Sequence, residues 1–104
     1  MSYPEWTTDE LASKLASGEA VNLVDVREVE EWEEGHINQA RLIPLSELTD
    51  RLDELKQGEE PIVLICRSGN RSGRACAYLA NEGYTVINIA GGMLDWSGDV
   101  VTGS

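Results

Sequence analysis

The stretch Ile62-Val63-Leu64-Ile65-Cys66-Arg67-Ser68-Gly69-Asn70-Arg71-Ser72-Gly73 joins an apolar run, a cysteine and a short polar loop. Four aliphatic residues in a row predict a strand that is buried on both faces. The segment after the loop, 74–80, has the composition of a helix, and Ser72 is its expected N-cap. Cys66 is therefore expected at the carboxyl end of a strand, where open α/β sheets bind their ligands.

Cys66 is the residue on which we expect the chemistry. Unpaired amides and the positive end of the helix dipole meet at a helix N-terminus, and both lower the pKa of a thiol. Three of the eight basic residues, Arg67, Arg71 and Arg74, fall in the same stretch and act in the same direction. The prediction is a nucleophilic thiolate in a cup that binds a small anion; the alternative, an inert buried thiol, does not suit this setting.

The composition limits the possible functions. A chain of 104 residues with net charge −11 predicts one domain, 1–104, that binds neither nucleic acid nor anionic membranes. Two cysteines ten residues apart and a single histidine predict no disulfide and no metal site, and we expect no cofactor. No apolar run reaches the ~18 residues of a membrane span, and residues 1–5 lack a leader pattern, so a cytoplasmic protein is expected unless a leader has been removed.

Strand-like and helix-like segments alternate along the chain. Residues 3–6 suit a short edge strand, and the strand-like segments after them are 20–26, 41–43, 62–66 and 84–89. A capping box at Thr7 and Glu10 predicts a helix that Gly18 ends. The other helix-like segments are 46–55, the one that continues to about residue 81, and a short piece after Gly91-Gly92. The alternation predicts a three-layer α/β fold whose sheet is mainly parallel, with helices on both faces.

Five motifs, in order along nearly the whole chain, resemble the rhodanese (thiosulfate sulfurtransferase) domain in its single-domain form. They are Val24-Asp25-Val26-Arg27, Gly35-His36-Ile37-Asn38-Gln39-Ala40, Ile43-Pro44-Leu45, the loop from Cys66 to Ser72, and Gly91-Gly92-Met93-Leu94-Asp95-Trp96. The chain departs from the family pattern in a shorter end after Trp96 and in a loop richer in arginine. The resemblance implies a five-stranded sheet, a persulfide on Cys66 and a mostly structural role for the stretch around Asp25 and Arg27.

The resemblance also implies the substrates and the binding residues. Thiosulfate would give its outer sulfur to Cys66 and release sulfite, and cyanide, a dithiol, or a thioredoxin-like or other protein would accept the sulfur in a ping-pong cycle. Backbone amides from Arg67 to about Ser72 would cradle the sulfur. Arg71 and Arg67 are candidates for the sulfonate end; alternatively, a carboxylate of the same domain holds Arg71, and Arg67 is merely exposed. The candidate substrate-binding residues are Arg67, Ser68, Gly69, Asn70, Arg71 and Ser72.

For several other residues the sequence predicts a structural role and not a chemical one. Cys76 suits a buried helix face better than a resolving thiol, and Arg74 suits the helix surface. His36 is expected to fix the loop after Gly35 rather than act as a base, and Trp96 is expected to close the core. In the acidic stretch 27–34, Val29 and Trp32 are expected to anchor a solvated helical turn.

Two other functions remain open on the sequence alone. Cysteine phosphatases and arsenate reductases need the spacing Cys-x5-Arg, so that an arginine folds over a tetrahedral anion. Here Arg71 comes one residue early, and Ser72 stands in the required position. The second alternative is a sulfur carrier or binding module that serves a protein partner.

Overall fold

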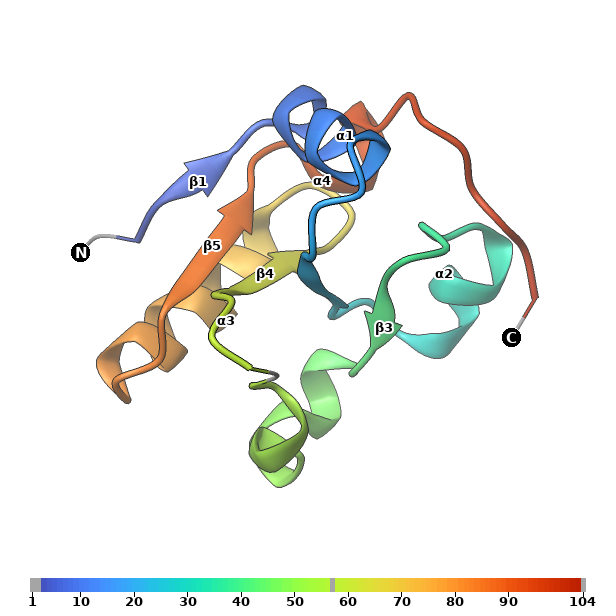
Figure 1. Ribbon diagram of the computed structural model, residues 1–104. Coiled ribbons are helices and arrows are strands. Elements are labelled where there is room, and N and C mark those ends of the chain that lie inside the picture. The colour runs from blue at the N-terminus through green and yellow to red at the C-terminus, as the bar shows by residue number, and fades with distance from the viewer. Residues whose placement is uncertain (1–2, 57, 104) are drawn as a thin grey trace.

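A parallel sheet of five strands forms the centre of the computed structural model, which describes residues 3–56 and 58–103 (Figure 1). The strand order across the sheet is β1-β5-β4-β2-β3, and every pairing is parallel. This arrangement confirms the α/β fold with a five-stranded parallel sheet. The strands are β1 (Glu5–Trp6), β2 (Asn22–Asp25), β3 (Arg41–Leu42), β4 (Ile62–Ile65) and β5 (Val86–Ile89).

The three central strands β2, β4 and β5 are buried along their whole length. Successive side chains point to opposite faces, so the continuous apolar runs supply two separate cores. Leu23, Val63 and Ile87 pair in register and face one core, whereas Val24 and Leu64 face the other. The apolar runs in the sequence therefore become the middle layer of a three-layer structure.

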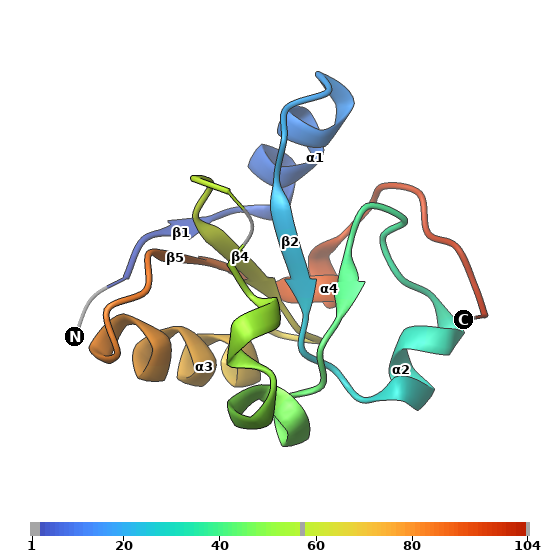
Figure 2. The same ribbon diagram turned by 60° about the horizontal axis from the view of Figure 1, so that its bottom comes forward.

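Helices cover both faces of the sheet (Figure 2). On one side lie α1 (Thr8–Ala16) and the short α4 (Gly92–Asp95), which contribute Leu11 and Met93 to one core. The other side carries α3 (Asn70–Asn81) and two 3-10 helices, η1 (Leu45–Asp50) and η2 (Leu52–Glu54). The helix α2 (Val29–Glu34) lies beyond the β3 edge. In the described part of the chain, no helix has the length and apolar character needed to cross a membrane.

Sequence patterns predicted some helices correctly and others wrongly. The capping box of α1 is present, with the Glu10 amide donating to the Thr7 hydroxyl and the Thr7 amide to the Glu10 carboxylate. The single helix predicted for 46–55 is wrong. The backbone leaves the helical region at Arg51, whose φ of −127° separates η1 from η2. The Arg51 side chain bonds Glu47 and Glu54 on either side of this break and stabilises the bent form.

The acidic segment before β3 is anchored differently from the prediction. Val29 is 45% exposed, so it anchors nothing. Trp32 instead stacks on the His36 ring, with centroids 3.6 Å apart. Asp25 and Arg27 have the expected structural role: both are buried, and the Arg27 guanidinium donates to the Asp25 carboxylate at 2.8 Å and to the Gly35 carbonyl at 2.8 Å. This pair fixes the turn that leaves β2.

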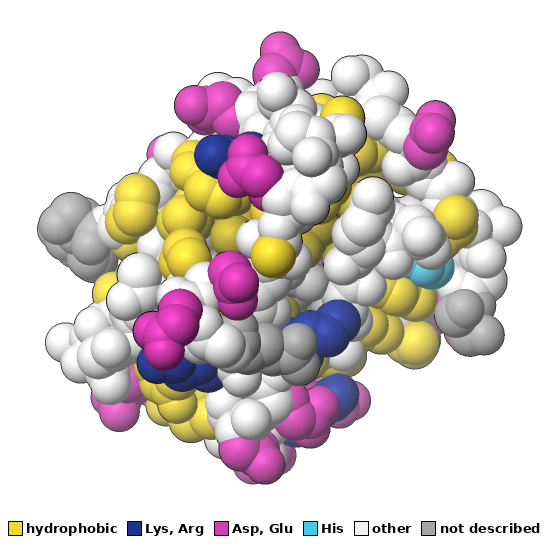
Figure 3. All heavy atoms as spheres, viewed as in Figure 1, with side chains coloured by type: hydrophobic (Ala, Val, Ile, Leu, Met, Phe, Trp, Pro, Cys, Tyr) yellow, Lys and Arg dark blue, Asp and Glu magenta, His cyan; other side chains and the backbone are white. Residues whose placement is uncertain are grey.

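Acidic residues dominate the charge of the chain but do not form one continuous patch on the face in Figure 3. On that face the acidic side chains stand at separate places, some at the edge and some nearer the middle, and basic side chains stand next to several of them. The large net negative charge is thus spread over different elements.

Candidate active site

Cys66 follows β4 directly and begins the loop that leads into α3. Gly69 has φ +98°, a left-handed conformation that glycine adopts without a steric penalty, and it turns the loop back over the cysteine. The Gly69 amide lies 3.1 Å from Cys66 Sγ and the Ser72 amide 3.4 Å, and both donate to it. The Ser72 hydroxyl lies 3.3 Å from the same sulfur. The loop therefore forms a cup of hydrogen-bond donors around one sulfur atom.

Ser72 is not the N-cap that the sequence predicted. The helix α3 begins at Asn70, with Gly69 in the N-cap position, so Ser72 lies in the first turn. From this position both its amide and its hydroxyl reach Cys66 Sγ. The residue that suggested a helix start is thus part of the sulfur site.

Burial and hydrogen bonding act in opposite directions on the thiol. Cys66 has no exposed surface, and burial raises the pKa of a thiol because the thiolate loses its hydration. Hydrogen bonds from the Ser72 hydroxyl and from the amides of Ser72, Gly69 and Ser68 lower the pKa, and together they outweigh burial. The pKa of Cys66 is therefore below its ordinary value, as a nucleophilic thiolate requires.

The start of α4 holds the backbone of the loop in place. The Met93 amide donates to the Cys66 carbonyl at 2.8 Å, and the Leu94 amide donates to the Arg67 carbonyl at 2.9 Å. Gly92 has φ +57°, and a Cβ atom there would collide with the backbone of Cys66 and Arg67. A glycine at the first position of α4 thus allows two backbone segments to touch beside Cys66.

The three arginines of the stretch differ in their surroundings. Arg71 forms a two-pronged ion pair with Glu31 of α2, with both hydrogen bonds at 2.8 Å. Arg67 and Arg74 are exposed. The structure thus shows the arrangement that the sequence left open as the alternative for Arg71, and contact of Arg71 or Arg67 with a sulfonate stays a prediction. Ser68 and Asn70 are also exposed in the loop, and their role in binding stays a prediction.

One polar residue beside the loop was missed at the level of sequence. Asn88 lies in β5 and is 2% exposed. Its Oδ1 accepts a 2.6 Å hydrogen bond from the Ser72 hydroxyl, and its Nδ2 donates to the carboxylate of Glu5 and to the Gly69 carbonyl. The available signal was a single amide inside an otherwise apolar strand, and such a buried amide must be hydrogen-bonded.

Packing and backbone contacts surround the other cysteine, the histidine and the last tryptophan. Cys76 is fully buried in the core under α3, and burial raises its pKa to about 12. His36 places Nδ1 2.7 Å from the Trp32 carbonyl, and its backbone pairs with Val101. Trp96 packs against the core between α1 and the sheet.

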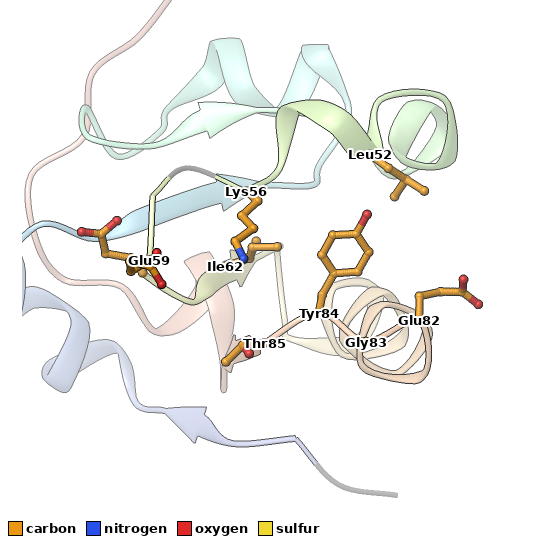
Figure 4. A pocket seen from close by; sticks show the side chains of 9 residues that line it. Leu52, Lys56, Glu59, Ile62, Glu82, Gly83, Tyr84 and Thr85 are labelled. Carbon is orange, nitrogen blue, oxygen red and sulfur yellow. The ribbon is translucent and has the colours of Figure 1, made fainter.

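A hollow of about 310 Å³ opens at the opposite end of the sheet (Figure 4). Ile62 at the start of β4 and Thr85 just before β5 line it, together with Lys56 and Tyr84. Cys66 follows the other end of β4, so this hollow is separate from the sulfur cup.

Comparisons with known proteins agree with this arrangement. A family model, described as the Rhodanese-like domain, matches residues 7–99. The Bacillus subtilis protein named "Putative sulfurtransferase YtwF" is 39% identical over 99 residues, which cover 95% of both chains. "Putative sulfur carrier protein YrkF" from the same species is 42% identical over 98 residues, or 93% of this chain, which spans only about half (52%) of that relative. The crystal structure of a rhodanese-like domain protein from Staphylococcus aureus superposes with a TM-score of 0.87 at 37% identity, covering 97% of this chain and 99% of the other.

Proposed function

The chain belongs to the rhodanese-like family, and on that premise we propose that it is a sulfurtransferase that carries sulfur on Cys66 as a persulfide. The donor is thiosulfate or a similar compound, and the acceptor is a thiophile such as cyanide or a dithiol. The observation that supports this proposal most directly is the convergence of the Gly69 amide, the Ser72 amide and the Ser72 hydroxyl on Sγ. Donors in this arrangement stabilise a negatively charged sulfur without supplying a proton.

In the first half-reaction, a lone pair of the Cys66 thiolate attacks the outer sulfur of thiosulfate. The sulfur–sulfur bond of thiosulfate breaks, and its electron pair leaves with sulfite. The outer sulfur stays bonded to Sγ as a negatively charged persulfide. The cup of amides around Cys66 stabilises the negative charge before and after this transfer.

In the second half-reaction, the acceptor attacks the outer sulfur of the persulfide. The bond to Sγ breaks and its electron pair returns to Cys66, which regenerates the thiolate; with cyanide the product is thiocyanate. Two successive transfers through one covalent intermediate give ping-pong kinetics.

Delivery to a protein is the second candidate, because one relative carries the name of a sulfur carrier and another that of a sulfurtransferase. A thioredoxin-like or other thiol protein would then take the place of cyanide. The phosphatase alternative has less support, because Ser72 faces the sulfur at the position where that chemistry needs an arginine. Arg71, which is adjacent to that position in the sequence, donates two hydrogen bonds to the Glu31 carboxylate instead.

Intact-protein mass spectrometry tests the proposal. Thiosulfate should add about 32 Da, one sulfur atom, to the wild type and nothing to Cys66→Ser, and cyanide should remove it and form thiocyanate. If thiosulfate adds no mass although Cys66 can be alkylated, the donor is a different compound, and mercaptopyruvate and protein persulfides are tested next. If Cys66 resists alkylation as well, the nucleophile assignment is wrong.

A further inference from the structure

Asn88 connects three separate segments of the chain beside Cys66. Its Oδ1 accepts from the Ser72 hydroxyl on α3 at 2.6 Å, and its Nδ2 lies 2.9 Å from Glu5 Oε2 on β1 and 3.3 Å from the Gly69 carbonyl in the loop. The residue is 2% exposed and stands between two isoleucines in β5. A buried amide at such a place is unfavourable unless it is fully bonded.

The partners determine which way the Asn88 amide points. A carboxylate and a carbonyl only accept hydrogen bonds, so the NH₂ group must face Glu5 and Gly69. The oxygen Oδ1 then faces Ser72, and since it can only accept, a hydrogen bond forms between them only when the Ser72 hydroxyl donates to Oδ1.

The Ser72 hydroxyl has one hydrogen atom and two acceptors within reach. Asn88 Oδ1 lies at 2.6 Å and Cys66 Sγ at 3.3 Å. While Cys66 is a thiol, its S–H can donate to the Ser72 oxygen, and the hydroxyl can donate to Asn88. Once the thiol loses its proton, the thiolate and Asn88 compete for the same hydrogen.

We propose that Asn88 is a positioning residue that limits the reactivity of Cys66 by competing with the thiolate for the hydroxyl hydrogen of Ser72, so that the sulfur receives only part of this hydrogen bond. Glu5 supports it by fixing the direction of the amide. The inference rests on the proposed role of Cys66 as nucleophile and extends the site to β5 and β1. Neither residue touches the sulfur, so both act through Ser72.

Other charged and titratable groups surround the same site. Arg71 and Cys76 on α3 interact electrostatically with Cys66, and the negative charge of Glu5 acts on Cys76. Arg67 carries a further positive charge in the loop. These groups act through space and do not depend on the Ser72 hydroxyl, which gives a way to separate the two effects.

A double-mutant cycle makes this separation. Asn88→Leu removes both amide atoms at similar size, and it is combined with Ser72→Ala. The readout is the pH midpoint of Cys66 alkylation by iodoacetamide, followed on the Cys66 peptide by mass spectrometry. With Ser72 present, Asn88→Leu should lower the midpoint by about one pH unit, because the hydroxyl then donates to the thiolate alone. In the Ser72→Ala background the midpoint should not move.

The proposal is wrong if Asn88→Leu shifts the pH midpoint of Cys66 alkylation equally in both backgrounds. It is also wrong if, with Ser72 present, the midpoint does not move or moves upward. Thermal unfolding checks that each variant is folded. Should Asn88→Leu not fold, Glu5→Ala gives a second cycle at an exposed position. Loss of the Glu5 charge should then shift the pH midpoint of Cys66 alkylation equally with and without Ser72. The loss of the hydrogen bond to the Asn88 amide should shift this midpoint further only where Ser72 is present. Alkylation involves no sulfur transfer, so failure of this cycle and failure of persulfide formation are separate results.

Discussion

The carboxylate of Glu31 and the guanidinium of Arg71 form two parallel hydrogen bonds of 2.8 Å, one from each terminal nitrogen of the guanidinium. They join α2 to the first turn of α3, next to the cup around Cys66. The hydrogen bonds from Arg71 hold the pKa of Glu31 at about 2, and the same contact raises the pKa of Arg71. The arginine that would attract an anionic donor is thus already paired with an anion.

Glu31→Gln should therefore increase the rate with thiosulfate. Removal of one negative charge near the loop leaves the positive charge of Arg71 uncompensated, and at a few ångströms in water such a charge changes the energy of an anion by about 1 kcal/mol. We expect kcat/KM for thiosulfate to rise about fivefold. Glu34→Gln makes the same charge change at an exposed position of α2 and is the matched control. An unchanged or lower value would mean that Arg71 takes no part in attracting the donor.

The same pair should contribute to stability only above acidic pH. The pKa of Glu31 in the folded protein is about 2, below its ordinary value of 4.5, so its contribution is present above pH 4.5 and is lost as the pH falls toward 2. At pH 7, Glu31→Gln should reduce the free energy of urea unfolding by about 1 kcal/mol. Near pH 2 the wild type and the variant should unfold alike. If the difference in unfolding free energy between the wild type and the variant stays the same at low pH, the charge of Glu31 does not cause it.

Ser72→Ala should make Cys66 less acidic. Loss of the hydroxyl removes one of the hydrogen bonds that lower the pKa of the thiol. The midpoint for alkylation should rise by about one pH unit, and the rate at pH 7 should fall about tenfold. Ser68→Ala is the control, because only the backbone amide of Ser68 faces the sulfur. Equal effects of the two variants would show that the hydroxyl is not the cause.

Gly92→Ala and Gly83→Ala form a pair that isolates the contact between α4 and the loop. Both glycines have positive φ, but a Cβ at Gly83 meets nothing within 4 Å, whereas one at Gly92 collides with the backbone of Cys66 and Arg67. Gly83→Ala should cost about 1–2 kcal/mol of unfolding free energy and leave Cys66 alkylation unchanged. Gly92→Ala should cost more and should also slow alkylation. If both variants lose the same unfolding free energy and keep the same rate of Cys66 alkylation, the loop adjusts to the added Cβ atom at position 92.

Cys76 should remain a thiol throughout the physiological range. Burial raises its pKa to about 12, so at pH 8 iodoacetamide should modify Cys66 and leave Cys76 unmodified. Cys76→Ala should keep the gain of one sulfur from thiosulfate, whereas Cys66→Ala should abolish it. Peptide mapping after alkylation and intact mass after thiosulfate provide the two measurements. Loss of sulfur loading in Cys76→Ala at unchanged fold would assign Cys76 a chemical role.

Local patterns predicted the features that depend on neighbouring residues. The strand before Cys66 follows from a continuous apolar run, and the helix after the loop follows from the helix-like composition of residues 74–80. The prediction placed the helix start too late, because Ser72 resembles a cap while its hydroxyl bonds the sulfur. The leucines of 46–55 also suited 3-10 geometry, which the sequence pattern could not distinguish from an α-helix.

Features that depend on strand order could not be predicted in the same way. Glu5 and Asn88 are far apart in sequence, and they meet only because β1 pairs with β5. Glu31 and Arg71 likewise lie on different helices and are brought together by the fold. A single sequence shows which residues are polar, but it does not show which distant residue each of them contacts.

The position of α4 also bears on how the protein acquires its reactivity during synthesis. A ribosome releases the chain from the N-terminus, so Cys66 emerges well before Met93 and Leu94, whose amides hold the loop backbone. β5, which carries Asn88 and lies between β1 and β4, also emerges after the cysteine. A nascent chain that ends before these residues carries a cysteine without its fixed donors, and such a thiol has ordinary acidity. The lowered pKa of Cys66 therefore arises only when the C-terminal part of the sheet has joined the rest, so the acidity of this thiol depends on a complete fold.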